Sequence, residues 1–140
     1  RGNAALVGTT SAAAIAGGYT PTTIKSIEIW NGSSWTSSPA TLIENNVGLA
    51  RAGSAYTSSL FSGGYDGSNN LTTSQGFDGT TVSTRPSIST ARRELGGCGT
   101  DSAALIFGGV PPSGIPGTTT ATEEFTGETT AASAKTIDFD

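Results

Sequence analysis

The sequence contains no histidine and no methionine, and it has a single cysteine, Cys98. Without histidine, Ser-His-Asp catalysis, Cys-His catalysis and histidine-ligated metal sites have no raw material. One cysteine allows no internal disulfide and no thiolate zinc site. We therefore expect no metal, no cofactor and no enzymatic activity.

Charge and long apolar runs are also scarce. Charged residues make up 13% of the chain, with 7 basic against 11 acidic side chains and a net charge of −4. Scattered basic residues in an acidic chain argue against a nucleic-acid surface. The longest apolar run, 12–16, is far shorter than the roughly 18–20 residues that span a bilayer. We expect neither nucleic-acid binding nor membrane insertion.

What the chain does have is small, turn-forming and hydroxyl-bearing residues. Its 140 residues include 20 glycines, 23 threonines and 18 serines, and the mass of 14.0 kDa allows one domain at most. Threonine favours strands, and glycine and serine favour the turns between them. No stretch has a convincing helical period. The composition indicates a turn-rich, all-β protein.

The sequence repeats three times. Pairs of glycines follow short apolar runs at spacings of 46 and 45 residues, and aromatic residues follow each pair at spacings of 47 and 48. These positions are Gly17, Gly18 and Trp30, then Gly63, Gly64 and Phe77, then Gly108, Gly109 and Phe125. We expect three units, at about 1–46, 47–92 and 93–140.

Each unit is predicted to contain four short strands, which in the first unit span 3–9, 11–17, 24–30 and 34–42. The pairs Asn31-Gly32 and Asp78-Gly79 separate the third and fourth strands. Such pairs accept positive φ at both central positions of a tight hairpin. We expect the second strand of each unit to be the most crowded, because its double glycine allows close backbone approach.

An apolar run, Gly-Gly, a variable loop, Glu-x-aromatic, a hairpin and a tryptophan resemble the kelch repeat, most closely at 14–19 and Trp35. The resemblance implies antiparallel four-stranded β-propeller blades. The segments 122–127 and 135–138, with Ala91-Arg92, resemble the degenerate kelch-like C-terminal repeats of marine bacteriophage virion proteins. This second resemblance implies a non-catalytic structural or adhesion module of a phage tail or appendage, located in the virion.

Three units are too few for a closed propeller, which typically has 4–8 blades. We therefore expect partners that complete a ring, either other copies or upstream blades of the same protein. Two copies would give six blades with two-fold symmetry. The chain lacks an initiator methionine, and Arg1 aligns with Arg92 inside a repeat, which favours a piece of a longer or processed protein.

Several polar residues have a structural and a functional interpretation. Glu28, Gln75 and Glu123 each stand two residues before the repeated aromatic, where they could accept hydrogen bonds from a neighbouring unit or line a channel; we favour the former. The segment 66–70 resembles a calcium loop but lacks its closing glutamate, so a turn is expected. Arg92 and Arg93 could grip a phosphate or sugar acid, although solvation or pairing with carboxylates is expected.

The repeat phase also assigns the apolar landmarks. Trp30, Trp35 and Phe77 could stack on sugars, but their phase predicts a core between units. Cys98 aligns with Val7 and is predicted to be a small core residue.

The loops after the double glycines, 19–23, 65–70 and 110–119, vary in length and chemistry. Variable loops on a repeated frame are typical of recognition. We predict a contact surface at Tyr19, Tyr65, Asp66 and Asn69, which would meet a virion protein or a host surface glycan. The alternatives are a general kelch-type protein–protein scaffold and, more remotely, a fragment of a propeller glycosidase.

Overall fold

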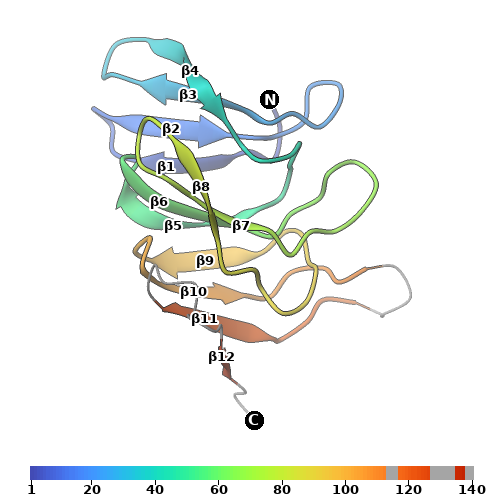
Figure 1. Ribbon diagram of the computed structural model, residues 1–140. Helices are drawn as coiled ribbons and strands as arrows, with labels where there is room; N and C mark the ends of the chain where they lie inside the picture. The colour runs from blue at the N-terminus through green and yellow to red at the C-terminus, as the bar shows by residue number, and fades with distance from the viewer. Residues whose placement is uncertain (113–116, 127–134, 138–140) are drawn as a thin grey trace.

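In the computed structural model, residues 1–112, 117–126 and 135–137 are described, and they contain three antiparallel sheets and no helix (Figure 1). The expected all-β antiparallel class is confirmed. The first sheet consists of β1 (Ala5–Gly8), β2 (Ala13–Ala16), β3 (Ser26–Trp30) and β4 (Trp35–Thr41). The second consists of β5 (Ala50–Ala55), β6 (Ser58–Ser62), β7 (Ser74–Phe77) and β8 (Val82–Arg85). The third consists of β9 (Gly96–Gly99), β10 (Ala103–Phe107), β11 (Thr122–Thr126) and β12 (Lys135–Ile137).

Within each sheet the spatial order of the strands follows their sequence order. The three sheets are stacked one on the next, and β5 contacts both β1 and β9 (Figure 1). We call the edge formed by β1, β5 and β9 the inner edge. The first strand of each sheet therefore occupies the crowded position that the sequence analysis assigned to the second. The described residues contain no helix that is long and apolar enough to cross a membrane.

Apolar side chains fill the two spaces between the sheets. Between the first and second sheets, Ile27 packs in one cluster with Phe61 and Phe77, and all three are buried. Between the second and third, Leu60 packs with Phe125 in the same way. Each sheet of short strands has too little surface to fold alone, so this stacking supplies the core.

Each sheet has two distinct faces because side chains alternate along a strand. We call the face that carries Gln75 and Phe77 in the second sheet, and Glu123 and Phe125 in the third, the A face. It lies against the preceding sheet. The opposite B face lies against the following sheet, as Leu60 does in the second sheet.

The first two double glycines lie where one sheet meets the segment that leads into the next. Both residues of each pair have positive φ, for example 64° at Gly17 and 107° at Gly18. The Gly18 amide donates to the Asn46 carbonyl at 2.8 Å, and the Gly64 amide donates to the Arg92 carbonyl at 2.7 Å. A Cβ atom at Gly17 would overlap the Asn46 carbonyl oxygen. The close approach is thus between neighbouring sheets.

Polar side chains tie neighbouring sheets together at the A faces. Gln75 Oε1 accepts a hydrogen bond from the Ile43 amide at 2.8 Å, and Glu123 Oε2 accepts one from the Ser89 amide at 2.6 Å. Both donors lie in segments that leave the preceding sheet. These two residues accept backbone hydrogen bonds from the neighbouring unit, as the sequence analysis expected.

An arginine–glutamate pair recurs in the first and third sheets. Arg92 is fully buried, donates to Glu123 Oε1 at 2.6 Å, and also donates to the carbonyls of Gly108 and Ala121 at 2.8 and 3.0 Å. Arg1 makes the same set of contacts, to Glu28 and to the carbonyls of Gly17 and Ser26. Of the two expectations for Arg92, pairing with a carboxylate of the neighbouring unit is confirmed, and solvation at the rim is wrong.

Three other expectations differ from the structure. Trp35 is exposed on β4 and tilts against Trp30, with ring centroids 5.5 Å apart, outside the core. Cys98 is exposed because it lies on the B face of the third sheet, which no described residue covers. The hairpins at Asn31 and Asp78 are four-residue loops rather than tight two-residue turns, since β4 and β8 begin at Trp35 and Val82.

Candidate functional site

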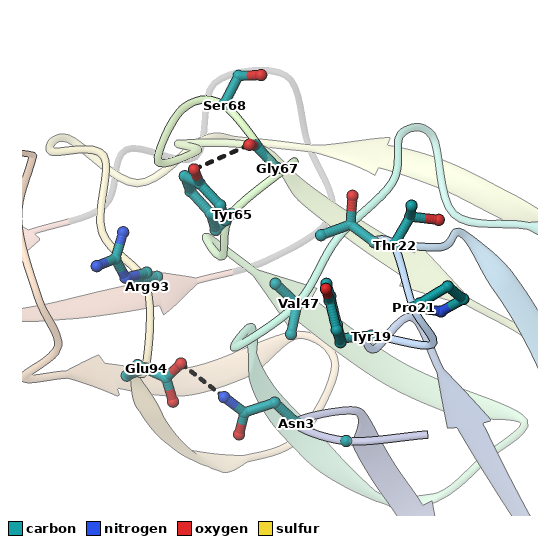
Figure 2. A pocket seen from close by; sticks show the side chains of 12 residues that line it. Asn3, Tyr19, Pro21, Thr22, Val47, Tyr65, Gly67, Ser68, Arg93 and Glu94 are labelled. Atoms are coloured by element: carbon teal, nitrogen blue, oxygen red, sulfur yellow. Dashed lines mark hydrogen bonds between the residues drawn. The ribbon is translucent and has the colours of Figure 1, made fainter.

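A cavity of about 890 Å³ lies beside the inner edge. Its walls come from the loops after β2 and β6 and from the segments that precede β1, β5 and β9 (Figure 2). Both loops leave the stack on the same side, at the right of Figure 1. The predicted residues Tyr19 and Tyr65, which are 46 positions apart, both line this cavity.

Backbone pairing places the two tyrosines. The amides and carbonyls of Tyr19 and Gly2 bond reciprocally at 2.9 and 3.1 Å, and those of Tyr65 and Val47 at 2.9 and 3.0 Å. Each tyrosine is therefore held beside the segment that begins its own sheet. Arg93 and Val110 repeat this arrangement in the third sheet. The repeat thus delivers equivalent loop positions to one side of the molecule.

Tyr65 and Arg93 form one wall of the cavity. The Tyr65 hydroxyl donates to the Gly67 carbonyl at 2.9 Å, which fixes the ring (Figure 2). The Arg93 guanidinium lies over that ring, 5.1 Å from its centroid, in cation–π geometry. Arg93 also donates to Asn70 Oδ1 at 3.3 Å. No carboxylate in the described part of the chain pairs with Arg93, so most of its five donors can meet a ligand.

Asn3 and Glu94 form the opposite edge. Asn3 Nδ2 donates to Glu94 Oε1 at 2.7 Å, which joins the first and third sheets across the cavity (Figure 2). Both residues have left-handed backbone conformations, with φ of 55° and 57°, and Gly48 takes the equivalent place in the second sheet with 67°. Such conformations are strained for non-glycine residues and often mark functional positions.

Asp66 shapes the loop rather than the cavity wall. Its Oδ1 accepts hydrogen bonds from the amides of Ser68 and Asn69 at 2.6 and 2.7 Å. These bonds, above all the one from Asn69, lower the pKa of the Asp66 carboxyl below 3.8. The segment is the turn that the sequence analysis favoured. Asn69 lines a neighbouring hollow of about 360 Å³, which shares Tyr65 and Arg93 with the larger one.

The site offers aromatic faces, a guanidinium, hydroxyls and one carboxylate. Tyr19 is exposed, and its side chain makes no hydrogen bond to any described residue. Glu94 is the one carboxylate among the described lining residues, and no group of metal-ligating side chains occurs in the described ranges. Such an arrangement can stack on and hydrogen-bond a polar ligand.

Sequence reasoning missed Asn3 and Glu94 as site residues, and it considered a binding role for Arg93 without favouring it. Their signal was available, because Asn3, Gly48 and Glu94 share one repeat phase just before the first strand of each unit. Of the predicted residues, Asp66 lines neither hollow. The double glycines, Trp30, Trp35, Phe77 and Phe125 also lie outside the cavity lining.

No protein-family model matches the chain, and a search of curated proteins finds no match. The function is therefore inferred from the site and from the repeats of the sequence.

Proposed function

We propose that this chain is a non-catalytic adhesion module of a bacteriophage virion that binds a host surface glycan in the cavity beside Tyr19, Tyr65 and Arg93. The scaffold is part of a kelch-like β-propeller, with the three sheets as blades and the inner edge facing the propeller axis. The resemblance of the repeats to phage virion proteins supports the virion setting. The glycan proposal rests on one observation, the convergence of two tyrosines and an arginine on one loop-lined cavity.

The chemistry of the cavity favours binding over hydrolysis. Sugars present apolar ring faces edged by hydroxyls, which suit aromatic side chains flanked by a few polar groups. Most glycoside hydrolases need two carboxylates about 5–10 Å apart. The described lining provides Glu94 alone, and its Oε1 is bonded to Asn3. A propeller glycosidase fragment is therefore disfavoured.

A glycan array with the fluorescently labelled chain tests the proposal. We expect binding to a restricted set of oligosaccharides, followed by measurable affinity in isothermal titration with the best of them. Tyr19→Ala and Arg93→Gln should each weaken that affinity at least about tenfold, because central aromatic and arginine contacts dominate binding.

The matched control is Ile43→Ala. Ile43 is 46% exposed and lies outside the cavity, so the glycan affinity of this variant should equal that of the unmodified chain. The proposal is overturned if the chain binds no glycan on the array, or if both cavity variants bind as tightly as the unmodified chain. Either result favours the general protein–protein scaffold. Detection of the chain in purified virions tests the virion setting separately.

A further inference from the structure

The A face of the first sheet and the B face of the third sheet are the two ends of the stack. On the first, Leu6 is 48% exposed, and Trp30 is half-buried although Phe77 and Phe125, at the same repeat position, are buried. On the second, Phe107 is 41% exposed, and Cys98 is exposed. Exposed large apolar side chains on a sheet face indicate a docking surface.

The two internal joints show what covers each face. In both joints, the B face of one sheet lies on the A face of the next, which buries Phe61 and Phe77 in one case and Ile106 and Phe125 in the other. The open end faces are one A face and one B face. The molecule therefore carries both halves of a third joint of the same kind.

Backbone hydrogen bonds follow the same pattern at the inner edge. The Gly48 amide donates to the Asn3 carbonyl at 3.1 Å, and the Glu94 amide donates to the Gly48 carbonyl at 2.7 Å. Within the described residues nothing pairs with the Asn3 amide or the Glu94 carbonyl, which are the donor and acceptor that a third joint would unite.

The double glycines leave a second complementary pair. Gly18 and Gly64 donate to the carbonyls of Asn46 and Arg92, which lie in the segments that lead into the next sheet. In the described ranges the Gly109 amide has no acceptor, and the carbonyl of Arg1, which holds the same repeat position as Asn46 and Arg92, has no donor. The donor stands at the third sheet and the acceptor at the first.

We propose that two copies of this chain join head to tail, with the B face of each third sheet on the A face of the other copy's first sheet. Two such joints close a ring of six sheets, the one multiple of three within the 4–8 blades that closed propellers use. The Gly109 amide of each copy donates to Arg1 of the other, and the Asn3 amide donates to Glu94. The ring also completes the cavity wall beside Asn3 and Glu94. The inference rests on the propeller architecture proposed above but not on glycan binding.

Native mass spectrometry and light scattering on the purified 140-residue chain test the ring. We expect a particle of twice 14.0 kDa. Leu6→Glu and Phe107→Glu should each yield single chains, with at least about a hundredfold weaker association, because each buries an unpaired carboxylate in an apolar joint. Ile43→Glu, a matched change at a residue 46% exposed away from both end faces, should leave the pair intact.

Mixing the two single variants identifies the kind of joint. Leu6→Glu leaves the B face intact and Phe107→Glu leaves the A face intact, so a mixture with one partner ¹⁵N-labelled should form mixed pairs through one sound joint. If the copies instead paired through two A faces or two B faces, only one of the two variants would lose the pair. The mixture would then contain no mixed pairs.

A single-chain mass for the unmodified chain at its highest soluble concentration overturns the proposal, and points to an upstream sheet or another protein as the occupant. Persistence of the pair in either variant does so as well. Circular dichroism of each variant must retain the β-sheet signal and a thermal transition. Because the readout is mass, failure here leaves the glycan proposal untouched.

Discussion

At the residue scale, Arg92 and Glu123 form a buried ion pair in the third sheet. Its side chains are 0% and 2% exposed, so neither charge is solvated. Arg92→Ala should lower the free energy of unfolding by about 3–5 kcal/mol, because it leaves the Glu123 carboxylate buried without its partner. Urea unfolding measures the difference, and a loss below about 1 kcal/mol would contradict the structure.

The second sheet suggests a compensating pair for the same site. There Asn46 and Gln75 replace the arginine and the glutamate, and each makes its own backbone bonds. The double variant Arg92→Asn with Glu123→Gln should therefore recover a large part of the stability that Arg92→Asn alone loses. A double-mutant cycle measures this coupling, and simple additivity of the two losses would show that the ion pair contributes nothing specific.

The Asp66 turn contributes to the way the folding stability of the chain changes at acidic pH. Hydrogen bonds from the Asn69 and Ser68 amides lower the folded-state pKa of Asp66, so the turn is stabilised above the unfolded value near 3.8 and loses this support as pH falls through the folded value. An NMR titration of the side-chain carboxyl should place its midpoint below 3.8. Asp78, bonded in the same way to Thr81 and Thr80, should shift in the same direction. A midpoint at or above 3.8 would mean that the turn bonds are absent in solution.

Some residue roles followed from the sequence and others did not. Gln75 and Glu123 were correctly expected to accept backbone hydrogen bonds, since a polar side chain that is buried at a repeated position needs a partner. Pairing of Arg92 with a carboxylate of the neighbouring unit was among the expectations, but its complete burial was not, because adjacent basic residues are typical of a solvated surface. The exposure of Cys98 was missed because repeat phase identifies a face but not whether another sheet covers it.

At the scale of elements, two glycine substitutions distinguish the cost of a positive φ from the cost of steric overlap between sheets. Gly17→Ala combines a positive φ with overlap on the Asn46 carbonyl, and should destabilise the chain by about 2–5 kcal/mol. Gly117→Ala has a similar φ of 78°, and no atom of the described residues lies within 4 Å of the added Cβ, so it should cost only about 1–2 kcal/mol. Thermal unfolding of both variants measures the gap. Equal losses would mean that the sheets do not approach closely at Gly17.

The elements themselves were predicted well where periodicity and turn residues agree. The expected strands 3–9, 11–17, 24–30 and 34–42 contain β1 to β4 of the first sheet. The hairpin type was not predicted, because the side chains of Asn31 and Asp78 bond the amides two and three residues on, and only Gly32 and Gly79 take positive φ. That side-chain contribution is invisible to a rule based on backbone angles alone.

At the scale of the whole molecule, part of the candidate site was predicted from the variability of the loops. Tyr19 and Tyr65 were expected to share a surface, and the structure brings them to one cavity. Arg93 and Glu94 enter that cavity from the segment before β9, because the stacking of the three sheets carries their inner edges together. This convergence depends on tertiary packing between sheets, which no single unit of the sequence contains.

The proposed ring makes a prediction at a glycine that is uncrowded within one chain. The nearest described atom to a Cβ on Gly108 is the Thr119 carbonyl oxygen at 3.9 Å, whereas a Cβ on Gly63, at the same repeat position, would lie 2.8 Å from the Arg92 carbonyl oxygen. In the ring, Arg1 of the second copy takes the place of Arg92. Gly108→Ala should therefore cost the single chain only the φ strain of about 1–2 kcal/mol.

The same variant should weaken pairing at least about tenfold, because the new Cβ meets the backbone of the second copy. Sedimentation velocity over a concentration series measures the association, and Gly117→Ala is the matched control with strained φ and open space. Since two identical joints hold the ring, one substitution in the sequence perturbs both. An unchanged pairing constant would show that third sheets do not receive first sheets in this register, whichever faces the copies share.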